Sequence, residues 1–365
     1  MQSAPVGIIG GGLSGLYAAY LLEQQGIRNS LLLEARQLLG GRILSLPAAA
    51  ATRQRFDLGP SWFWPELQPR LDHLIDELGL ESYPQYESGD CVVERSWQEA
   101  PIRLPGYVSA PTSMRLRGGM AALLDALRER LSGTQIITAQ RVYRLCHRGS
   151  DIEVFSSTNA GTRQQSWRFQ QVLLALPPRL AGQLEFSPPL PPSLRASWQA
   201  TDTWMAAQGK YVAVYERPFW RQLGLSGEGR SVRGPLGEIH DASLPGGQAA
   251  LMGFLGLPAD ARRSLGESEL RRHCRAQLQR MFGAAAASPR EEFLKDWAAD
   301  ACTATAADLD SRGLHGFAPS AWALSGPWQG RLAGIASEWA SQFPGYIAGA
   351  LEATHGGLQA LNLQA

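Results

Sequence analysis

The stretch VGIIGGGLSGLYAAYLL, residues 6–22, decides the fold. It sets the glycines Gly10, Gly12 and Gly15 between an apolar strand and a helix with apolar periodicity. In such a turn the first glycine permits a tight bend, the second lets the backbone approach a pyrophosphate, and the third packs helix against strand. The free N–H groups at the start of the helix attract an anion. The stretch therefore predicts a nucleotide site.

An acid and a second glycine pair strengthen this interpretation. Glu34 stands 19 residues after Gly15, at the end of the next strand, where it is placed to accept ribose hydroxyls. A glycine turn without a ligand is the alternative, but the strand, the helix and the spaced acid together favour nucleotide binding. Gly40, Gly41 and Arg42 follow, and they suit a longer ligand whose phosphate Arg42 neutralises. For Arg42 alone, a solvated turn cation is the alternative.

Composition and charge exclude several classes of protein. The chain has 365 residues, 44% of them hydrophobic, and a net charge of +1, which is typical of a globular protein of two domains and suggests neither nucleic acid nor an anionic membrane as a partner. The four cysteines are scattered, so neither a disulfide framework nor a metal site is indicated. No segment reaches the length of apolar sequence that a membrane helix needs, and the N-terminus lacks the basic start of a signal peptide. We therefore expect a cytoplasmic protein.

Periodicity and turn residues predict the elements along the rest of the chain. We expect helices over 66–80, 118–131 and 268–282, strands over 134–148, 151–157, 167–178, 210–220 and 248–256, and a mixed, irregular segment over 81–114. The proline-rich run FSPPLPPSLRAS, residues 186–197, is expected to be a hinge between domains.

Several motifs, in collinear order, carry a resemblance to a known family. They are residues 6–42, FDLGPSWFW (56–64), RLRGGMAALLDAL (115–127), QRVYRL (140–145), LLALPP (173–178) with EFSPPLPP (185–192), and SEWASQFPGYIAGALEA (337–353). Together they resemble the flavin-containing amine oxidase superfamily, which includes monoamine oxidases and L-amino-acid oxidases. The similarity runs from about residue 5 to residue 360, so it is far more specific than any single motif.

The resemblance implies FAD as the cofactor and assigns residues to it. The implied cofactor-binding residues are Gly10, Gly12, Leu13, Ser14, Gly15, Glu34, Ala35, Arg36, Gly41, Arg42, Gly59, Pro60, Ser61, Trp62, Val142, Ser337, Glu338 and Ile347. Val142 would touch the adenine end through backbone atoms, Glu338 would lie near the ribityl-phosphate region, and Ile347 would offer a backbone N–H. The implied catalytic residues are Lys210 and Tyr346, the latter over the flavin ring.

The resemblance also implies a two-domain fold that the chain crosses several times. The α/β, Rossmann-like FAD-binding domain would comprise residues 1–80, 113–198 and 311–365. The discontinuous α+β substrate-binding domain would comprise residues 81–112 and 199–310.

Three departures from the family pattern limit what is carried over. Only residues 81–114 fill the place of a long helical section in larger relatives, so we expect a reduced lid. Ala306 and Ala307 stand where mitochondrial members have the flavin-linked cysteine and one wall of an aromatic cage, so we expect non-covalent FAD and an incomplete cage. Cys302 lies four residues too early for that link and is expected to be inert. Ala348 replaces a frequent glutamate.

Other aromatic side chains are candidates for the substrate pocket, with core packing as the alternative for each. They are Trp62, Phe63, Trp64, Trp220, Trp328 and Phe343.

Lys210 is one of only two lysines in a chain with 32 arginines, the other being Lys295. Alternation in the strand KYVAVY puts Lys210, Val212 and Val214 on one face. The alternative, a lysine at the end of a strand reaching water, would suit arginine equally well. Lys210 stands nine residues before Phe219, the spacing of the family's active-site lysine from its own Pro-Phe-Trp. The resemblance implies that it holds a water at flavin N5, which suits a compact ammonium whose pKa burial can lower.

These features favour an FAD-dependent amine oxidase with a small-molecule amine as substrate and dioxygen as acceptor. The alternatives are a desaturase or dehydrogenase of the same fold, similar to carotenoid desaturase or protoporphyrinogen oxidase, and a flavin-binding protein without turnover. The sequence fixes neither the choice between amines and amino acids nor the oligomeric state.

Overall fold

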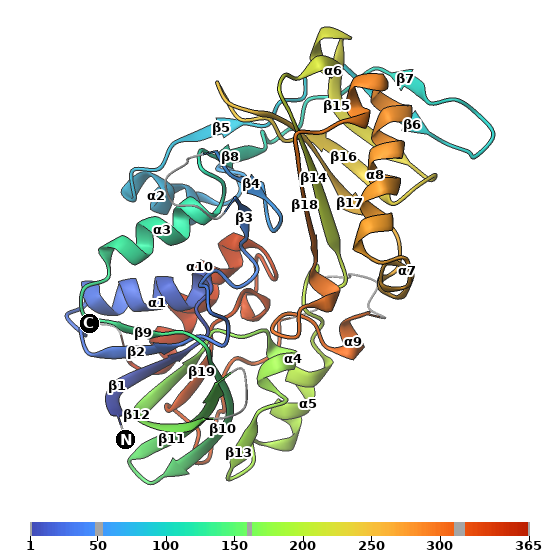
Figure 1. The fold of residues 1–365 in the computed structure, drawn as a ribbon. Coiled ribbons are helices and arrows are strands. Elements are labelled where there is room, and N and C mark those ends of the chain that lie inside the picture. The colour runs from blue at the N-terminus through green and yellow to red at the C-terminus, as the bar shows by residue number, and fades with distance from the viewer. Residues whose placement is uncertain (1, 48–53, 159–162, 310–317, 364–365) are drawn as a thin grey trace. The chain divides into compact units, whose positions relative to one another are not determined.

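The structure is a computed structural model that describes residues 2–47, 54–158, 163–309 and 318–363. The chain forms two compact units, each built from separate stretches of sequence (Figure 1). Unit 1 comprises Met1–Arg42, Leu123–Ala206 and Asp300–Ala365, and unit 2 comprises Ile43–Ala122 and Ala207–Ala299.

Unit 1 is an eight-stranded sheet with helices. Its elements are β1 (Gln2–Ile9), α1 (Leu13–Gln24), β2 (Ser30–Leu33), most of α3 (Ala121–Arg130), β9 (Gln135–Ile137), β10 (Gln140–Arg148), β11 (Asp151–Thr158), β12 (Gln164–Leu174), α4 (Pro178–Ala181), β13 (Glu185–Ser187), α5 (Pro192–Ala200), α9 (Ala306–Leu309), β19 (Leu332–Gly334), the 3₁₀ turn η3 (Ser337–Trp339) and α10 (Ile347–Ala360). The strand order is β13-β10-β11-β12-β1-β2-β9, with β19 also paired to β12. β9, β2, β1, β12 and β19 pair in parallel, and β10 and β11 pair as an antiparallel hairpin that continues the sheet.

Helix α1 connects the parallel strands β1 and β2, as the sequence predicts for a strand-turn-helix-strand unit. β2 is buried throughout, which is typical of a parallel strand covered on both faces. α1 lies beside α10, and the hydroxyl of Tyr17 contacts Nε2 of His355 at 3.0 Å (Figure 1). Helices from near the two ends of the described chain therefore pack against each other in unit 1.

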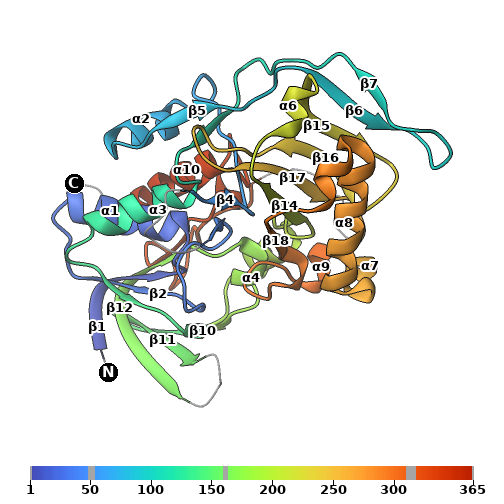
Figure 2. The same cartoon turned by 45° about the horizontal axis from the view of Figure 1, so that its top comes forward.

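Unit 2 is built around a seven-stranded sheet. Its elements are β3 (Ser45–Leu46), β4 (Phe56–Asp57), α2 (Pro69–Glu77), β5 (Ser82–Pro84), β6 (Asp90–Glu94), β7 (Ile102–Leu104), β8 (Met114–Leu116), β14 (Gly209–Tyr215), α6 (Phe219–Gln222), β15 (Leu225–Ser231), β16 (Leu236–Asp241), β17 (Ala249–Leu255), α7 (Ala259–Leu265), α8 (Glu267–Phe282), η1 (Ala284–Ala287), β18 (Glu291–Asp296) and η2 (Trp297–Ala299). The order of the large sheet is β18-β14-β17-β16-β15-β6-β7. Helix α8 packs its apolar side on one face of this sheet, through Leu270, Leu278 and Phe282 among others (Figure 2).

Most expected elements are present, with differences that have physical reasons. The strand expected over 134–148 is broken at Ala139, whose φ of 57° is left-handed, so its two halves join the sheet in different places, as β9 and β10. The segment 81–114 is more regular than expected, because β6 and β7 extend the sheet of unit 2. The proline-rich run leads into α5, whose first residue is Pro192, a favoured helix start.

The division of the chain by packing differs from the expected domains. Residues 43–80 and 113–122 pack in unit 2, whereas residues 199–206 and 300–309 pack in unit 1. Residues 311–317 of the expected FAD domain lie outside the described residues. The expected domains are defined by what they bind, so their assignment stays a prediction.

Candidate active site

The glycine turn between β1 and α1 has two glycines that the protein requires. Gly10 has a φ of 113°, and a Cβ there would lie 2.5 Å from the carbonyl oxygen of Ala175. A Cβ on Gly15 would collide with the carbonyl oxygen of Gly10, so Gly15 lets helix and strand approach closely. Gly12 differs, because its Cβ would meet nothing closer than Cα of Gly41, at 3.6 Å. No described protein atom therefore requires a glycine at position 12. A ligand that approaches the backbone of Gly12 would require it.

The N-terminus of α1 is suited to an anion. Gly12 caps the helix and has no side chain to satisfy the N–H groups of Leu13, Ser14 and Gly15, and the first turn carries no acid. Gly12 also forms a bridge to Gly40, so the second glycine pair lies beside the first turn. This geometry fits the pyrophosphate of a dinucleotide.

Glu34 is buried at the end of β2, with 4% of its surface exposed. Its Oε2 accepts the backbone N–H of Gly11 at 2.6 Å, and its Oε1 accepts that of Arg36 at 2.7 Å. Two main-chain donors therefore fix the orientation of the carboxylate, and each oxygen retains a lone pair for another donor. Ala35 is half-buried in the same short segment.

Arg36 contacts the segment that contains Cys302. Its Nη2 donates to Oδ1 of Asp300 at 2.8 Å and to the hydroxyl of Thr303 at 3.0 Å. Oδ1 of Asp300 also accepts the backbone N–H of Cys302 at 3.0 Å. Cys302 is thus held near the acid expected to bind ribose. Such a position suits the inert role expected for it rather than a link to the flavin ring.

Arg42, Ser337 and Glu338 form one cluster in unit 1. The guanidinium of Arg42 forms a two-pronged ion pair with Glu338, in which Nη2 donates to Oε2 at 2.8 Å. The same nitrogen donates to the hydroxyl of Ser337 at 3.1 Å. The sequence predicts all three as cofactor-binding residues. The structure brings them together although Arg42 precedes the other two by almost 300 positions.

Three further predicted residues lie in unit 1, two of them at the start of α10 and the third within β10. Tyr346 is the N-cap of α10 and makes no side-chain cap bond, so the first N–H groups of the helix, beginning with Ile347, have no partner within the helix. Tyr346 is 36% exposed. Val142 lies where the pairing of β10 with β11 shifts register, which interrupts the regular ladder there.

In unit 2, Lys210 is buried in β14, between β17 and β18, and only 2% of its surface is exposed. Its Nζ donates to the carbonyl oxygen of Gly59 at 3.0 Å and to the hydroxyl of Ser61 at 2.6 Å. The rings of Trp62 and Phe254 lie 5.8 and 5.3 Å from Nζ. An ammonium has three donors, so two are used by these oxygens and one is left for another acceptor.

Burial lowers the pKa of Lys210 from 10.5 to about 7. The Asp57 carboxyl opposes this shift and raises the pKa of the lysine, whereas the Arg115 guanidinium lowers it further. Asp57 is itself buried, and burial raises the pKa of its carboxyl. Its Oδ1 accepts from the Ser45 hydroxyl and the Met120 N–H, and its Oδ2 has no hydrogen-bond partner among the described residues.

The alternation expected along β14 is confirmed. Val212 and Val214 lie in an apolar cluster with Phe56 and Leu58, on the face that carries Lys210, while the intervening residues pack on the other face with α8. The indole N–H of Trp297 donates to the carbonyl oxygen of Leu58 at 2.8 Å and so fixes the segment to which Lys210 is bonded. The alternative of a lysine that reaches water is wrong, because Lys210 is buried.

The predicted site residues thus fall into two groups, one in each unit. Gly59, Ser61 and Trp62 contact Lys210 in unit 2, Pro60 lies in the same segment, and the remainder lie in unit 1. For Phe63, Trp220 and Trp328 the core alternative is confirmed, since all three are fully buried.

Sequence reasoning missed several residues of these groups. Asp57 and Arg115 stand inside motifs that the sequence analysis quotes, yet no local pattern shows that they approach Lys210. Trp204 lies beside Tyr346, with ring centroids 6.2 Å apart and planes inclined by 31°. It has no motif of its own, and its place just before β14 was the only available signal.

The fold and the glycine turn are those of a dinucleotide-binding protein, and its second unit contains a buried lysine whose pKa is lowered. Comparison with known families agrees. Residues 8–78 match the model of an NAD(P)-binding Rossmann-like domain, and residues 94–355 match that of the flavin containing amine oxidoreductases. The latter match covers most of the chain, so the protein belongs to the flavin-containing amine oxidoreductase family and is an oxidoreductase of that type.

Individual relatives span nearly the whole chain. A probable flavin-containing monoamine oxidase A of Dictyostelium discoideum is 25% identical, over 94% of each chain. Putrescine oxidase of Kocuria rosea is 24% identical, over 91% of this chain and 90% of its own. The structure of wild-type putrescine oxidase bound to putrescine matches with a TM-score of 0.77 and 21% identity, over 99% of each chain, which shows a shared fold. Within the part of the chain that the structure describes, no helix is long and apolar enough to span a membrane.

Proposed function

We propose that this protein is an amine oxidase that binds FAD without a covalent link, oxidises a neutral amine at its α-carbon and uses dioxygen as acceptor. The observation that carries the proposal is Lys210, a buried lysine with a pKa of about 7 that is bonded to Gly59 and Ser61. Family membership and the glycine turn support the flavin.

The residues present fit FAD. Leu13, Ser14 and Gly15 would bind the pyrophosphate through their N–H groups, and Glu34 would accept the ribose hydroxyls through its remaining lone pairs. Arg42 and Glu338 would act near the phosphates and the ribityl chain. Alanine at 306 supports a non-covalent cofactor, because its methyl group cannot form a thioether. The FAD and substrate domains expected from the resemblance are part of this proposal.

When bound, the flavin would supply the acceptor for hydride equivalents from the amine, giving an imine that water hydrolyses, and dioxygen would then be reduced to hydrogen peroxide. The protein's own residues would position the amine and manage protons. With a pKa of about 7, Nζ of Lys210 exists in both protonation states near neutral pH, so its third donor can hold a water and exchange a proton with it.

Tyr346 would provide an aromatic face to the amine, since its ring is partly exposed while its backbone caps α10. An aromatic face next to the substrate removes water from the amine and favours the neutral form that can lose hydride. The hydroxyl is not needed for this role, which makes the proposal testable by conservative substitution.

An anaerobic titration tests the function. Purified protein with FAD is mixed in turn with putrescine, benzylamine, 2-phenylethylamine, L-leucine and a polyene, and absorbance near the flavin maximum is followed before and after air is admitted. Bleaching by an amine, with hydrogen peroxide on reoxidation, is expected. Bleaching only by a non-amine such as a polyene would indicate the desaturase, and no bleaching by any compound would indicate a flavin-binding protein without turnover. Flavin that stays on the peptide after acid denaturation would contradict non-covalent binding.

A further inference from the structure

Trp204 lies against the turn that presents Tyr346. Gly345, just before the tyrosine, has a left-handed φ of 83°, and a Cβ there would collide with Cβ of Trp204. The tryptophan therefore packs on the backbone of this turn, and only glycine at position 345 permits it. The two rings, 6.2 Å apart with planes inclined by 31°, form a continuous aromatic surface.

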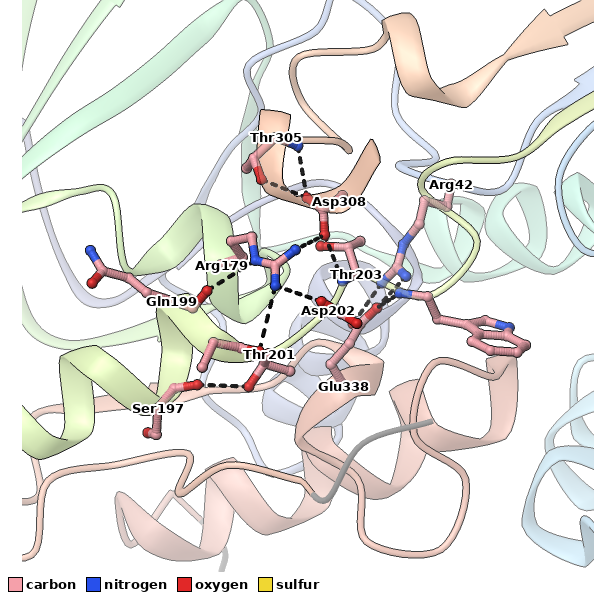
Figure 3. A network of polar contacts seen from close by, with 12 residues as sticks. Arg42, Arg179, Ser197, Gln199, Thr201, Asp202, Thr203, Thr305, Asp308 and Glu338 are labelled. Carbon is pink, nitrogen blue, oxygen red and sulfur yellow. Dashed lines mark hydrogen bonds and ion pairs between the residues drawn. The ribbon is translucent and has the colours of Figure 1, made fainter. Parts of the chain in front are cut away.

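An ion-pair network around the buried side chains of Arg179 and Asp308 holds the segment before Trp204 (Figure 3). The guanidinium of Arg179 donates to Oδ1 of Asp308 and to Oδ1 of Asp202, each at 2.6 Å. The same oxygen of Asp308 accepts the backbone N–H of Thr203 at 2.9 Å, and its other oxygen accepts from Thr305. The residues from 201 to 206 form neither helix nor strand, so these bonds determine their path.

The backbone of Trp204 is also tied to the predicted cofactor cluster. Its N–H donates to Oε1 of Glu338 at 3.2 Å, and this carboxylate is the one that pairs with Arg42. The position of the indole is thus fixed from two sides, by the Arg179 network and by Glu338. Isolated buried ion pairs contribute little net stability because their desolvation is costly. Positioning of the loop is therefore the better reason for this network.

Helix α9 offers no aromatic side chain at the position where the family resemblance expects one, so a second ring beside Tyr346 has to come from the loop that carries Trp204. Ala307, where the family resemblance expects one wall of an aromatic cage, is exposed and carries only a methyl group. The next residue, Asp308, is buried and bonds to Thr203. The helix that would supply an aromatic wall instead holds the loop that carries Trp204.

We propose that Trp204 is the second aromatic ring of the amine-binding surface beside Tyr346, with Arg179, Asp202 and Asp308 as positioning residues, and that this surface selects amines with an aromatic or bulky apolar group. The inference rests on the proposed function.

The charges of this cluster support the selectivity. Each of these three carboxylates is bonded to an arginine, Asp202 and Asp308 to the Arg179 that they share and Glu338 to Arg42, so a second ammonium group would have to displace an existing ion pair. A diamine such as putrescine would gain little here, whereas a phenyl group would bury its area on two ring faces.

Binding of aniline tests the surface independently of turnover, because aniline is an aromatic amine without an α-hydrogen. Its binding to the FAD-loaded protein is measured from the change in the flavin spectrum. We expect Trp204→Ala to raise the Kd of aniline at least tenfold and Trp204→Phe to raise it less than threefold. FAD affinity should stay unchanged, because the contact with Glu338 is made by the backbone. Trp97→Ala is the matched control, because Trp97 is 69% exposed and lies in unit 2. This variant should bind aniline with the affinity of the parent.

Rapid-mixing reduction of the flavin separates selectivity from rate. Trp204→Ala should raise the apparent Kd of 2-phenylethylamine tenfold or more and that of putrescine less than twofold. Asp202→Asn, at a partly exposed partner of Arg179, should give a smaller increase for 2-phenylethylamine with the limiting rate and Tm unchanged. Equal aniline affinity in parent and Trp204→Ala would overturn the inference, whereas aniline binding without flavin reduction by any amine would overturn only the proposed function.

Discussion

Glu34 in unit 1 and Lys210 in unit 2 are both buried charged residues, but they are held in opposite ways. The partners of Glu34 are the N–H groups of Gly11 and Arg36, from the same strand-turn-helix-strand unit. The partners of Lys210 are Gly59 and Ser61, about 150 positions away in the sequence. A local motif can therefore specify the surroundings of the acid, whereas only the packing of unit 2 specifies those of the lysine.

The two groups also differ in how well their charge is compensated. Glu34 receives two main-chain N–H donors, one at each carboxylate oxygen, and such charge-assisted hydrogen bonds are strong. The ammonium of Lys210 is completely buried and donates hydrogen bonds to one carbonyl oxygen and one hydroxyl. These bonds do not offset the cost of burial, so the pKa of the lysine falls to about 7. The first arrangement suits binding and the second suits proton exchange.

The largest effect is expected at the acid. Glu34→Ala removes a charge-assisted hydrogen bond to ribose and should weaken FAD binding by ~1.5–3 kcal/mol. Because Gly11 and Arg36 also lose their acceptor, the apoprotein should be less stable as well, so FAD affinity and apoprotein unfolding must be measured separately. Glu34→Gln, which keeps one acceptor oxygen, should lie between parent and alanine. FAD retention equal to the parent would refute the ribose assignment.

The second effect is a pH dependence of stability specific to Lys210. A lysine whose pKa is lowered in the folded state binds fewer protons there than in the unfolded state, so its destabilising effect is relieved as pH rises from about 7 towards 10.5. Relative to Lys210→Met, the parent should gain about 2 kcal/mol of unfolding free energy between pH 7.5 and 9.5. Urea denaturation at fixed excess FAD measures this.

Lys295→Met is the matched control for that measurement, because Lys295 lies directly opposite Lys210 on β18 and is only half-buried. It should show no such gain. If the unfolding free energies of the parent and of Lys210→Met changed in parallel with pH, Lys210 would be charged over the whole pH range measured.

The third effect is kinetic. Lys210→Met keeps the length of the side chain but cannot hold a water or move a proton, so at least one half-reaction should slow tenfold or more, on the order of 1.4 kcal/mol. FAD should stay bound. Stopped-flow traces of flavin reduction and reoxidation identify the step, and Lys295→Met should match the parent. Parent rates for both half-reactions in Lys210→Met would leave the lysine a structural residue only.

The smallest effect is expected for the hydroxyl of Tyr346. Tyr346→Phe keeps the aromatic face and should change the flavin-reduction rate only mildly, whereas Tyr346→Ala should slow it much more without loss of folding. The comparison is made by rapid mixing with one amine, alongside thermal unfolding of both variants. Equal losses in the two variants would assign the role to the hydroxyl and remove the aromatic-face argument.

The sequence by itself determined the glycine turn, the acid after β2, the alternation along β14 and the family, because each depends on residue types at short or fixed spacing. Only the tertiary structure decided the rest. It showed that the chain's two lysines lie opposite each other on β14 and β18, that Asp57 and Arg115 act on the pKa of Lys210, and that Trp204 stands beside Tyr346. The physical reason is that burial and contact between distant segments depend on how sheets and loops pack, and no local spacing of residues encodes that packing.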